Sequence, residues 1–148
     1  MNQVRVIGVG SPVANDQLGW QAINVLEQAQ VLNKIPEQID LCCSDRPGAG
    51  LLSLFENFSC VLLIDAIASS ENSDGVLRLE KEDLLLNPTT VSSHAFGVAE
   101  ALTLGDKLGL LPEKIILYGY AANGTGLFSQ QQVQQLASVL IEELQTLQ

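Results

Sequence analysis

The chain contains little of what catalytic and binding sites are usually built from. Its 148 residues include one histidine, three cysteines and seven lysines or arginines. With 17 acidic residues against those seven cations, the formal net charge is −10. Because such a surface repels phosphate backbones, nucleic acid is a poor candidate partner. A basic protein or peptide, or a cation, fits the charge better.

Cysteine is too scarce for a disulfide framework. Cys42, Cys43 and Cys60 are odd in number, and the adjacent pair cannot easily bridge to each other. Their apolar surroundings predict buried, reduced thiols. The CxxC spacing of common zinc sites is missing as well.

Long hydrophobic runs are also missing from the sequence. No apolar run approaches the roughly 18 residues that a membrane-spanning helix needs. The opening MNQVRVIGVG enters a strand-like pattern directly and lacks the layout of a signal peptide. We therefore expect a cytoplasmic protein with no membrane partner. Hydrophobic residues make up 47% of the chain, enough for one full core, so we expect a single domain over residues 1–148.

Short apolar runs alternate with helical periodicity from end to end. Strands are predicted at 4–7, 39–44, 60–64, 76–80 and 114–118, the fourth as an edge strand because it alternates. Helices are predicted at 18–28, at 51–55, from near His94 to 108, and after Ser129, where Gln132 completes a capping-box spacing. The pattern indicates an α/β fold with three layers, in which helices cover both faces of a twisted, mostly parallel, five-stranded sheet. Ligands of such sheets bind beyond the carboxyl ends of the strands.

Three residues at these strand and helix edges could carry chemistry. Asp65 ends the predicted third strand, Asp16 precedes the first helix, and His94 stands near the start of the third helix. Each has a structural alternative, since Asp16 and Asp65 could cap helices or hold loops, and His94 could bond a neighbouring serine. Together they form an oxygen and nitrogen ligand set that suits Zn, Ni, Mn or Fe and leaves positions open for substrate. The helix dipole favours a neutral, metal-binding imidazole at His94.

Other well-known sites are missing. The Gly8-Val9-Gly10 segment lacks the third glycine of a dinucleotide-binding loop, and neither GxxxxGK[ST] nor GxSxG occurs. A cysteine–histidine nucleophile could use Cys43 or Cys60, but both lie inside predicted apolar strands, where thiols are usually inert.

The sequence resembles the hydrogenase maturation proteases over nearly its whole length. The resemblance is carried by GVGSPVANDQLG at 8–19, DRPGAG at 45–50, LLIDAI at 62–67, SSHAFGVAEAL at 92–102 and GYAANGTGLFSQ at 119–130. It implies a hydrolase, an endopeptidase of aspartic or metal-dependent type. Such an enzyme removes the C-terminal extension of a [NiFe] hydrogenase large-subunit precursor after nickel insertion and so activates the hydrogenase. The precursor is then the partner.

The resemblance also implies residue roles. Asp16, Asp65 and His94 match the family's nickel ligands, and the nickel arrives with the substrate. Asp16, Asp65 and Asp45 match acidic residues implicated in catalysis. The loop implicated in substrate recognition matches Asp45, Arg46, Pro47 and Gly48. Departures such as Gly10-Ser11, where many members have Gly-Asn, leave open which hydrogenase is processed.

Two mechanisms and two rival functions stay open at this point. The metal could polarise the scissile carbonyl or activate water, or a carboxylate such as Asp16 or Asp45 could act as general base. A nickel-binding chaperone would use the same ligands without hydrolysis. In a phospho-receiver module Asp65 would accept the phosphoryl group, but the end of the fifth strand, Tyr118-Gly119-Tyr120, lacks the lysine that receivers need there. We expect a monomer, because no long exposed apolar helix face is evident.

Overall fold

The computed structural model describes residues 3–10, 18–45, 49–68, 75–86, 98–122 and 129–147. The strands are β1 (Val4–Gly10), β2 (Asp40–Asp45), β3 (Cys60–Ala68), β4 (Gly75–Glu80) and β5 (Lys114–Ala122). The helical segments are α1 (Leu18–Val31), the 3-10 helix η1 (Ala49–Phe55), α2 (Lys81–Leu86), α3 (Val98–Leu108) and α4 (Gln130–Thr146).

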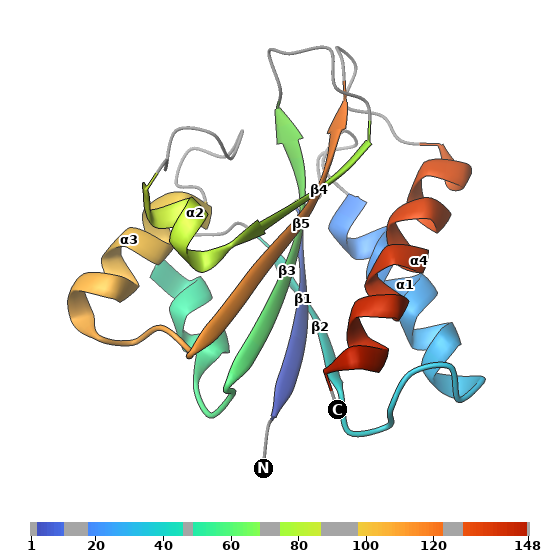
Figure 1. Ribbon diagram of the computed structural model, residues 1–148, viewed down its shortest axis with the longest axis horizontal. Helices are drawn as coiled ribbons and strands as arrows, with labels where there is room; N and C mark the ends of the chain where they lie inside the picture. The colour runs from blue at the N-terminus through green and yellow to red at the C-terminus, as the bar shows by residue number, and fades with distance from the viewer. Residues whose placement is uncertain are drawn as a thin grey trace.

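The five strands form one mixed sheet in the order β2-β1-β3-β5-β4. Strands β2, β1, β3 and β5 are parallel, and only β4 runs antiparallel, at the edge beside β5. Helices α1 and α4 cover one face, and η1, α2 and α3 cover the other (Figure 1). The three-layer α/β fold and the edge position of the fourth strand are therefore confirmed.

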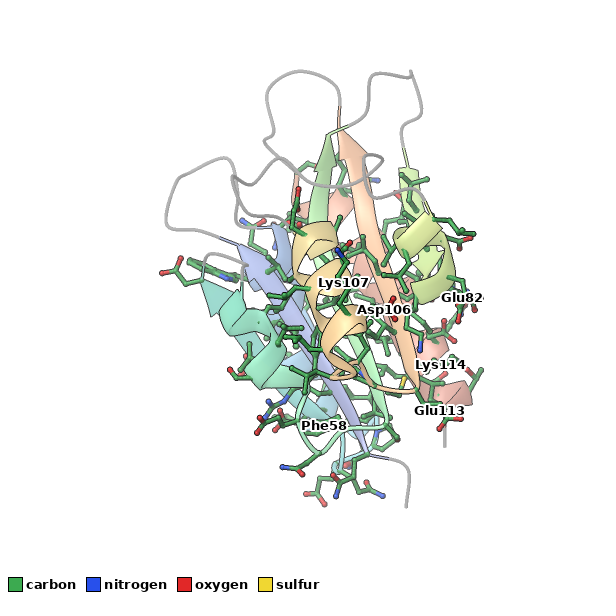
Figure 2. All side chains as sticks on the ribbon, turned by 90° about the vertical axis from the view of Figure 1, so that its left-hand side faces the viewer. Phe58, Glu82, Asp106, Lys107, Glu113 and Lys114 are labelled. Carbon is green, nitrogen blue, oxygen red and sulfur yellow. The ribbon has the colours of Figure 1, made fainter. Side chains whose placement is uncertain are left out.

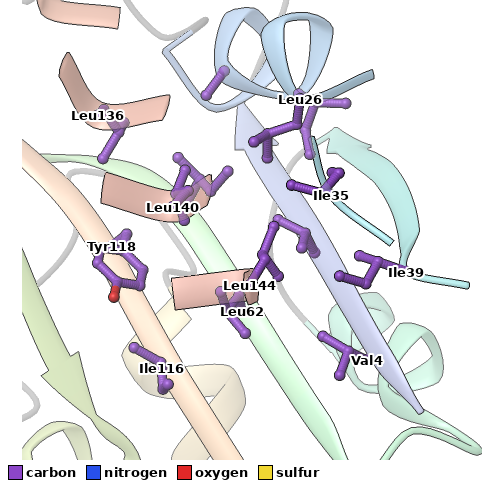
Figure 3. Packing of buried hydrophobic residues seen from close by; sticks show 14 of the residues in the cluster. Val4, Leu26, Ile35, Ile39, Leu62, Ile116, Tyr118, Leu136, Leu140 and Leu144 are labelled. Atoms are coloured by element: carbon purple, nitrogen blue, oxygen red, sulfur yellow. The ribbon is translucent and has the colours of Figure 1, made fainter. Parts of the chain in front are cut away.

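Two hydrophobic cores lie on the two faces of the sheet. Side chains alternate along β3, so that Leu62 and Ile64 pack with α1 and α4, whereas Val61 and Leu63 pack with η1, α2 and α3. Figure 3 shows the first core, in which Leu136, Leu140 and Leu144 of α4 lie over the sheet. Ser129 caps α4 through the predicted capping box with Gln132.

Several predicted boundaries are wrong, for physical reasons. Gly8 and Gly10 do not break β1, because the strand stays paired with β2 as far as Gly10. At Gly8, α1 approaches the strand so closely that a Cβ would clash with the Gly19 carbonyl oxygen. Strands β3 and β5 run on past Ile64 and Tyr118 because they pair with each other as far as Ala68 and Ala122. The predicted helix start near His94 lies outside the described residues.

Helix α2 was not predicted. Its first turn carries Glu82 and Asp83, which suit a helix N-terminus, and the Asp83 carboxylate accepts a hydrogen bond from the Glu80 amide at 3.0 Å. The prediction that all cysteines are buried is wrong for Cys43, which is exposed because β2 is an edge strand. Within the described ranges, no helix is both long and apolar enough to cross a membrane.

Candidate active site

The sheet has a topological switch point between β1 and β3. Chain connections lead from β1 to β2 on one side, while β5 and β4 lie on the other side, beyond β3. Pairing between β1 and β3 ends at Gly8 and Ile64, whereas β3 stays paired with β5 to its last residue. Beyond Gly8 and Ile64, toward the carboxyl ends of the strands, β1 and β3 are therefore no longer paired with each other. This is the position at which α/β folds bind ligands.

Asp65 is the first residue after the last β1–β3 pair, and its side chain is completely buried. Strand alternation puts it on the face of Val61 and Leu63, toward η1, α2 and α3. Its partner on β5 is Gly119, which contributes no side chain beside it. The prediction that Asp65 ends its strand is wrong, since β3 continues to Ala68. A carboxylate buried to this degree requires hydrogen bonds, an opposite charge or a metal to offset its desolvation.

Ser44 is the other buried polar residue of the described part of the chain. It pairs with Val9 of β1 and shares a face with Cys42, which packs in the same core as Leu63. Ser44 and Asp65 thus lie on one face of the sheet, two strands or roughly 10 Å apart. Ser44 was not among the predicted site residues. The sequence feature that could have identified Ser44 is a hydroxyl residue at the end of a predicted apolar strand, next to the candidate carboxylate of Asp45.

Asp45 is the last residue of β2 and pairs with Gly10. It is exposed, and alternation puts it on the face of Leu41 and Cys43, which α1 covers. Asp45 and Asp65 therefore belong to opposite faces of the sheet. Only a ligand that lies beyond the strand ends can approach both carboxylates.

The first turn of α1 lies directly on these strand ends. A Cβ on Gly19 would meet the Val9 carbonyl oxygen at 2.5 Å and the Ile64 carbonyl oxygen at 2.7 Å, so that only glycine permits this approach. The next residue, Trp20, donates a hydrogen bond from its indole Nε1 to the Ser44 carbonyl oxygen at 3.1 Å. One helical turn thus contacts β1, β2 and β3 within a residue or two of Asp65 and Asp45.

The other predicted site residues, Asp16, Arg46, Pro47, Gly48 and His94, lie outside the described residues, so their roles stay predictions. Their described neighbours Leu18 and Val98 are buried in the two different cores, one on each face of the sheet. Among the residues that the structure does describe, no group of three or more histidine, cysteine or acidic side chains could hold a metal ion.

The cysteines do not form an alternative nucleophilic centre. Cys60 is buried at the first residue of β3, the end of the strand opposite to Asp65, and burial raises the pKa of its thiol. Burial likewise raises the pKa of Cys42 and of the more exposed Cys43, so all three thiols favour the protonated, weakly nucleophilic form.

Solved structures with the same architecture are found among the hydrogenase maturation proteases. The hydrogenase maturating endopeptidase HybD from Escherichia coli matches with a TM-score of 0.67 and 23% identity, over 99% of this chain and 89% of that one. The [NiFe] hydrogenase maturation protease HycI from Thermococcus kodakarensis matches with a TM-score of 0.66 and 20% identity, over 97% and 93%. This chain has the fold of the hydrogenase maturation endopeptidases. HybD from Thermococcus kodakarensis, at 16% identity, covers 99% of both chains with a TM-score of 0.66.

No protein-family model and no curated protein matches the sequence significantly. The maturation-endopeptidase fold nevertheless bears on the receiver alternative. Receivers of the flavodoxin-like type have the strand order 2-1-3-4-5. Here β5 lies beside β3, and β4 is an antiparallel edge strand. The topology therefore argues against a phospho-receiver.

Proposed function

We propose that this protein is an endopeptidase that removes the C-terminal extension of a [NiFe] hydrogenase large-subunit precursor after nickel insertion. The observation that carries the proposal is the completely buried Asp65 carboxylate at the switch point of a chain with the maturation-endopeptidase fold. A buried acid in a ligand-binding crevice is a common mark of a working site.

In this proposal Asp16, Asp65 and His94 contact the nickel ion, which belongs to the precursor. Two carboxylates and one imidazole suit a borderline divalent ion and leave positions open for the ligands that the precursor supplies. Chain connectivity limits how far two of these residues can lie from their described neighbours. Asp16 precedes Leu18 by two residues and His94 precedes Val98 by four, which limits their reach from those anchors to about 7 Å and about 14 Å.

Recognition of nickel in the precursor would make cleavage depend on metal occupancy. The reaction adds water across one peptide bond: the oxygen bonds to the carbonyl carbon, the C–N bond breaks, and the leaving nitrogen gains a proton. Either nickel activates the water or carbonyl, or a carboxylate accepts the proton from water. Asp16 and Asp45 are the candidate bases. Asp45, exposed at the end of β2, is also placed to recognise a basic group of the precursor.

Asp45→Asn separates its two roles. Loss of a general base lowers kcat, whereas loss of a recognition contact raises KM and leaves kcat unchanged. Full activity of this variant would remove Asp45 from both roles.

The proposal is tested by mixing the protein with nickel-loaded large-subunit precursor and following the precursor's mass, with nickel-free precursor as the control. Loss of a short C-terminal peptide from the loaded precursor alone is the expected result. Asp65→Asn should abolish cleavage. The matched control is Asp106→Asn, which alters an exposed carboxylate in the last turn of α3, near Lys107 (Figure 2).

Two other results would each contradict one part of the proposal, the peptidase activity or the position of the site. Tight binding of the loaded precursor without cleavage would favour the nickel-binding chaperone. Equal cleavage by Asp65→Asn and wild type would show that the crevice at the switch point is not the active site.

A further inference from the structure

The first turn of α1 contacts the two strands that carry the described carboxylates, β3 beside Asp65 and β2 beside Asp45. Gly19 lies against the backbone of Ile64, the residue before Asp65. Trp20, the only tryptophan of the chain, is half-buried, and its indole N–H binds the carbonyl oxygen of Ser44, the residue before Asp45. A single dipeptide of the helix therefore contacts both strands next to their carboxylates, β3 by close packing and β2 by a hydrogen bond.

We propose that Trp20 is a positioning residue, which holds the end of β2 and hence Asp45 at a fixed place relative to Asp65. The inference rests on the proposed function for its catalytic consequence. Trp20 contacts no reacting atom in this scheme. Trp20 fixes the position of the end of β2. It thereby determines where a precursor peptide contacts this strand when the nickel centre of the precursor lies at Asp65.

The position of β2 in the sheet explains why its end needs the hydrogen bond from Trp20. It is an edge strand, paired with β1 alone, and its pairing ends at Asp45 with Gly10. Strand ends with one neighbour open easily, because few hydrogen bonds resist fraying. Without the indole N–H, the Ser44 carbonyl would bond to water, and the end of β2 would be held less firmly against α1.

The same helix supplies a matched control at its other end. Gln30 of α1 donates from its Nε2 to the Ile39 carbonyl oxygen at 2.9 Å and to the Pro36 carbonyl oxygen at 3.0 Å. Like Trp20, Gln30 joins α1 to backbone carbonyl oxygens through a side-chain N–H, in this case to the residues directly before β2. Gln30→Met removes these bonds but acts at the beginning of β2, away from Asp45.

The kinetic test compares Trp20→Phe, Gln30→Met and wild type on nickel-loaded precursor. Trp20→Phe should raise KM about fivefold, the factor that one neutral hydrogen bond is worth, with kcat within about twofold. Gln30→Met should leave both constants unchanged. If Trp20 acts through Asp45, the effect of Asp45→Asn on KM should shrink when Trp20→Phe is already present, since coupled residues are non-additive.

A second variant keeps the shape of the indole. Benzothienylalanine, incorporated at the single tryptophan position, replaces the N–H by sulfur and preserves the ring system. It should reproduce the KM effect of Trp20→Phe. A normal KM in this variant would show that packing, not the hydrogen bond, matters, and would overturn the proposal.

Hydrogen exchange tests the positioning without any cleavage. Amides of Cys42 to Asp45 should exchange about fivefold faster in both Trp20 variants than in wild type, and at the wild-type rate in Gln30→Met. Unchanged exchange in the Trp20 variants would overturn the proposal. If wild type cleaves no precursor yet exchange responds as expected, the proposed function fails while the positioning of β2 by Trp20 stands.

Discussion

The close contact between α1 and the strands makes Gly19 a position where a single methyl group should destabilise the fold. A Cβ there would meet three backbone atoms: the Val9 carbonyl oxygen at 2.5 Å, the Val9 nitrogen at 2.6 Å and the Ile64 carbonyl oxygen at 2.7 Å. Ordinary contacts of a Cβ begin at 3.4 Å, so the helix must retreat by about 0.9 Å. Backbone atoms inside a sheet cannot rotate away as side chains can.

The size of the effect in Gly19→Ala follows from two opposing contributions. Overpacking of this kind lowers the free energy of unfolding by about 1–3 kcal/mol, and the better helix propensity of alanine offsets up to about 1 kcal/mol of this loss. We expect a net loss of about 1–2 kcal/mol in the free energy of unfolding, because the clash involves backbone on both strands. For a chain of this length, that lowers Tm by about 2–8 °C.

The matched control is Gly50→Ala, since a Cβ on Gly50 meets nothing within 4 Å. It should change the unfolding free energy by no more than about 0.5 kcal/mol. Urea denaturation followed by circular dichroism measures both variants, and unchanged m-values would show that stability alone has moved. Because Gly19 lies against the residue before Asp65, Gly19→Ala should also slow precursor processing under conditions where the variant is fully folded. Wild-type stability and activity in Gly19→Ala would refute the packing argument.

Two further predictions concern titration and reactivity. Burial and its hydrogen bond to Glu143 (2.6 Å) raise the pKa of Tyr118 to about 12, so the unfolded chain loses this proton first and stability should fall between pH 10 and pH 12. Tyr118→Phe should flatten this part of the pH profile measured by urea denaturation, and an unchanged slope would contradict the assignment. A thiol reagent should modify the exposed Cys43 before the buried Cys60, as mass spectrometry of partly labelled protein would show; the reverse order would contradict the burial pattern.

The sequence predicted the architecture because its evidence is local. Apolar runs and helical periodicity are repeated along the chain, and the capping box of Ser129 and Gln132 needs only residues within one turn. The same reasoning identified Asp65, since an acid after an apolar run in an α/β chain falls at the ligand-binding edge of the sheet.

The features that decide the site depend on contacts between distant segments. Strand β3 runs past Asp65 only because β5 pairs with it, and Asp65 becomes a buried residue instead of a strand end. Periodicity could show that Asp45 ends a strand, but not that it lies on the opposite face from Asp65. The contact of Trp20 with Ser44 joins a helix to the strand that follows it. The sequence by itself determined which residues are candidates for chemistry, and the tertiary structure alone decided that Asp65 is buried and lies on the opposite face of the sheet from Asp45, because pairing and packing arise between segments far apart in the chain.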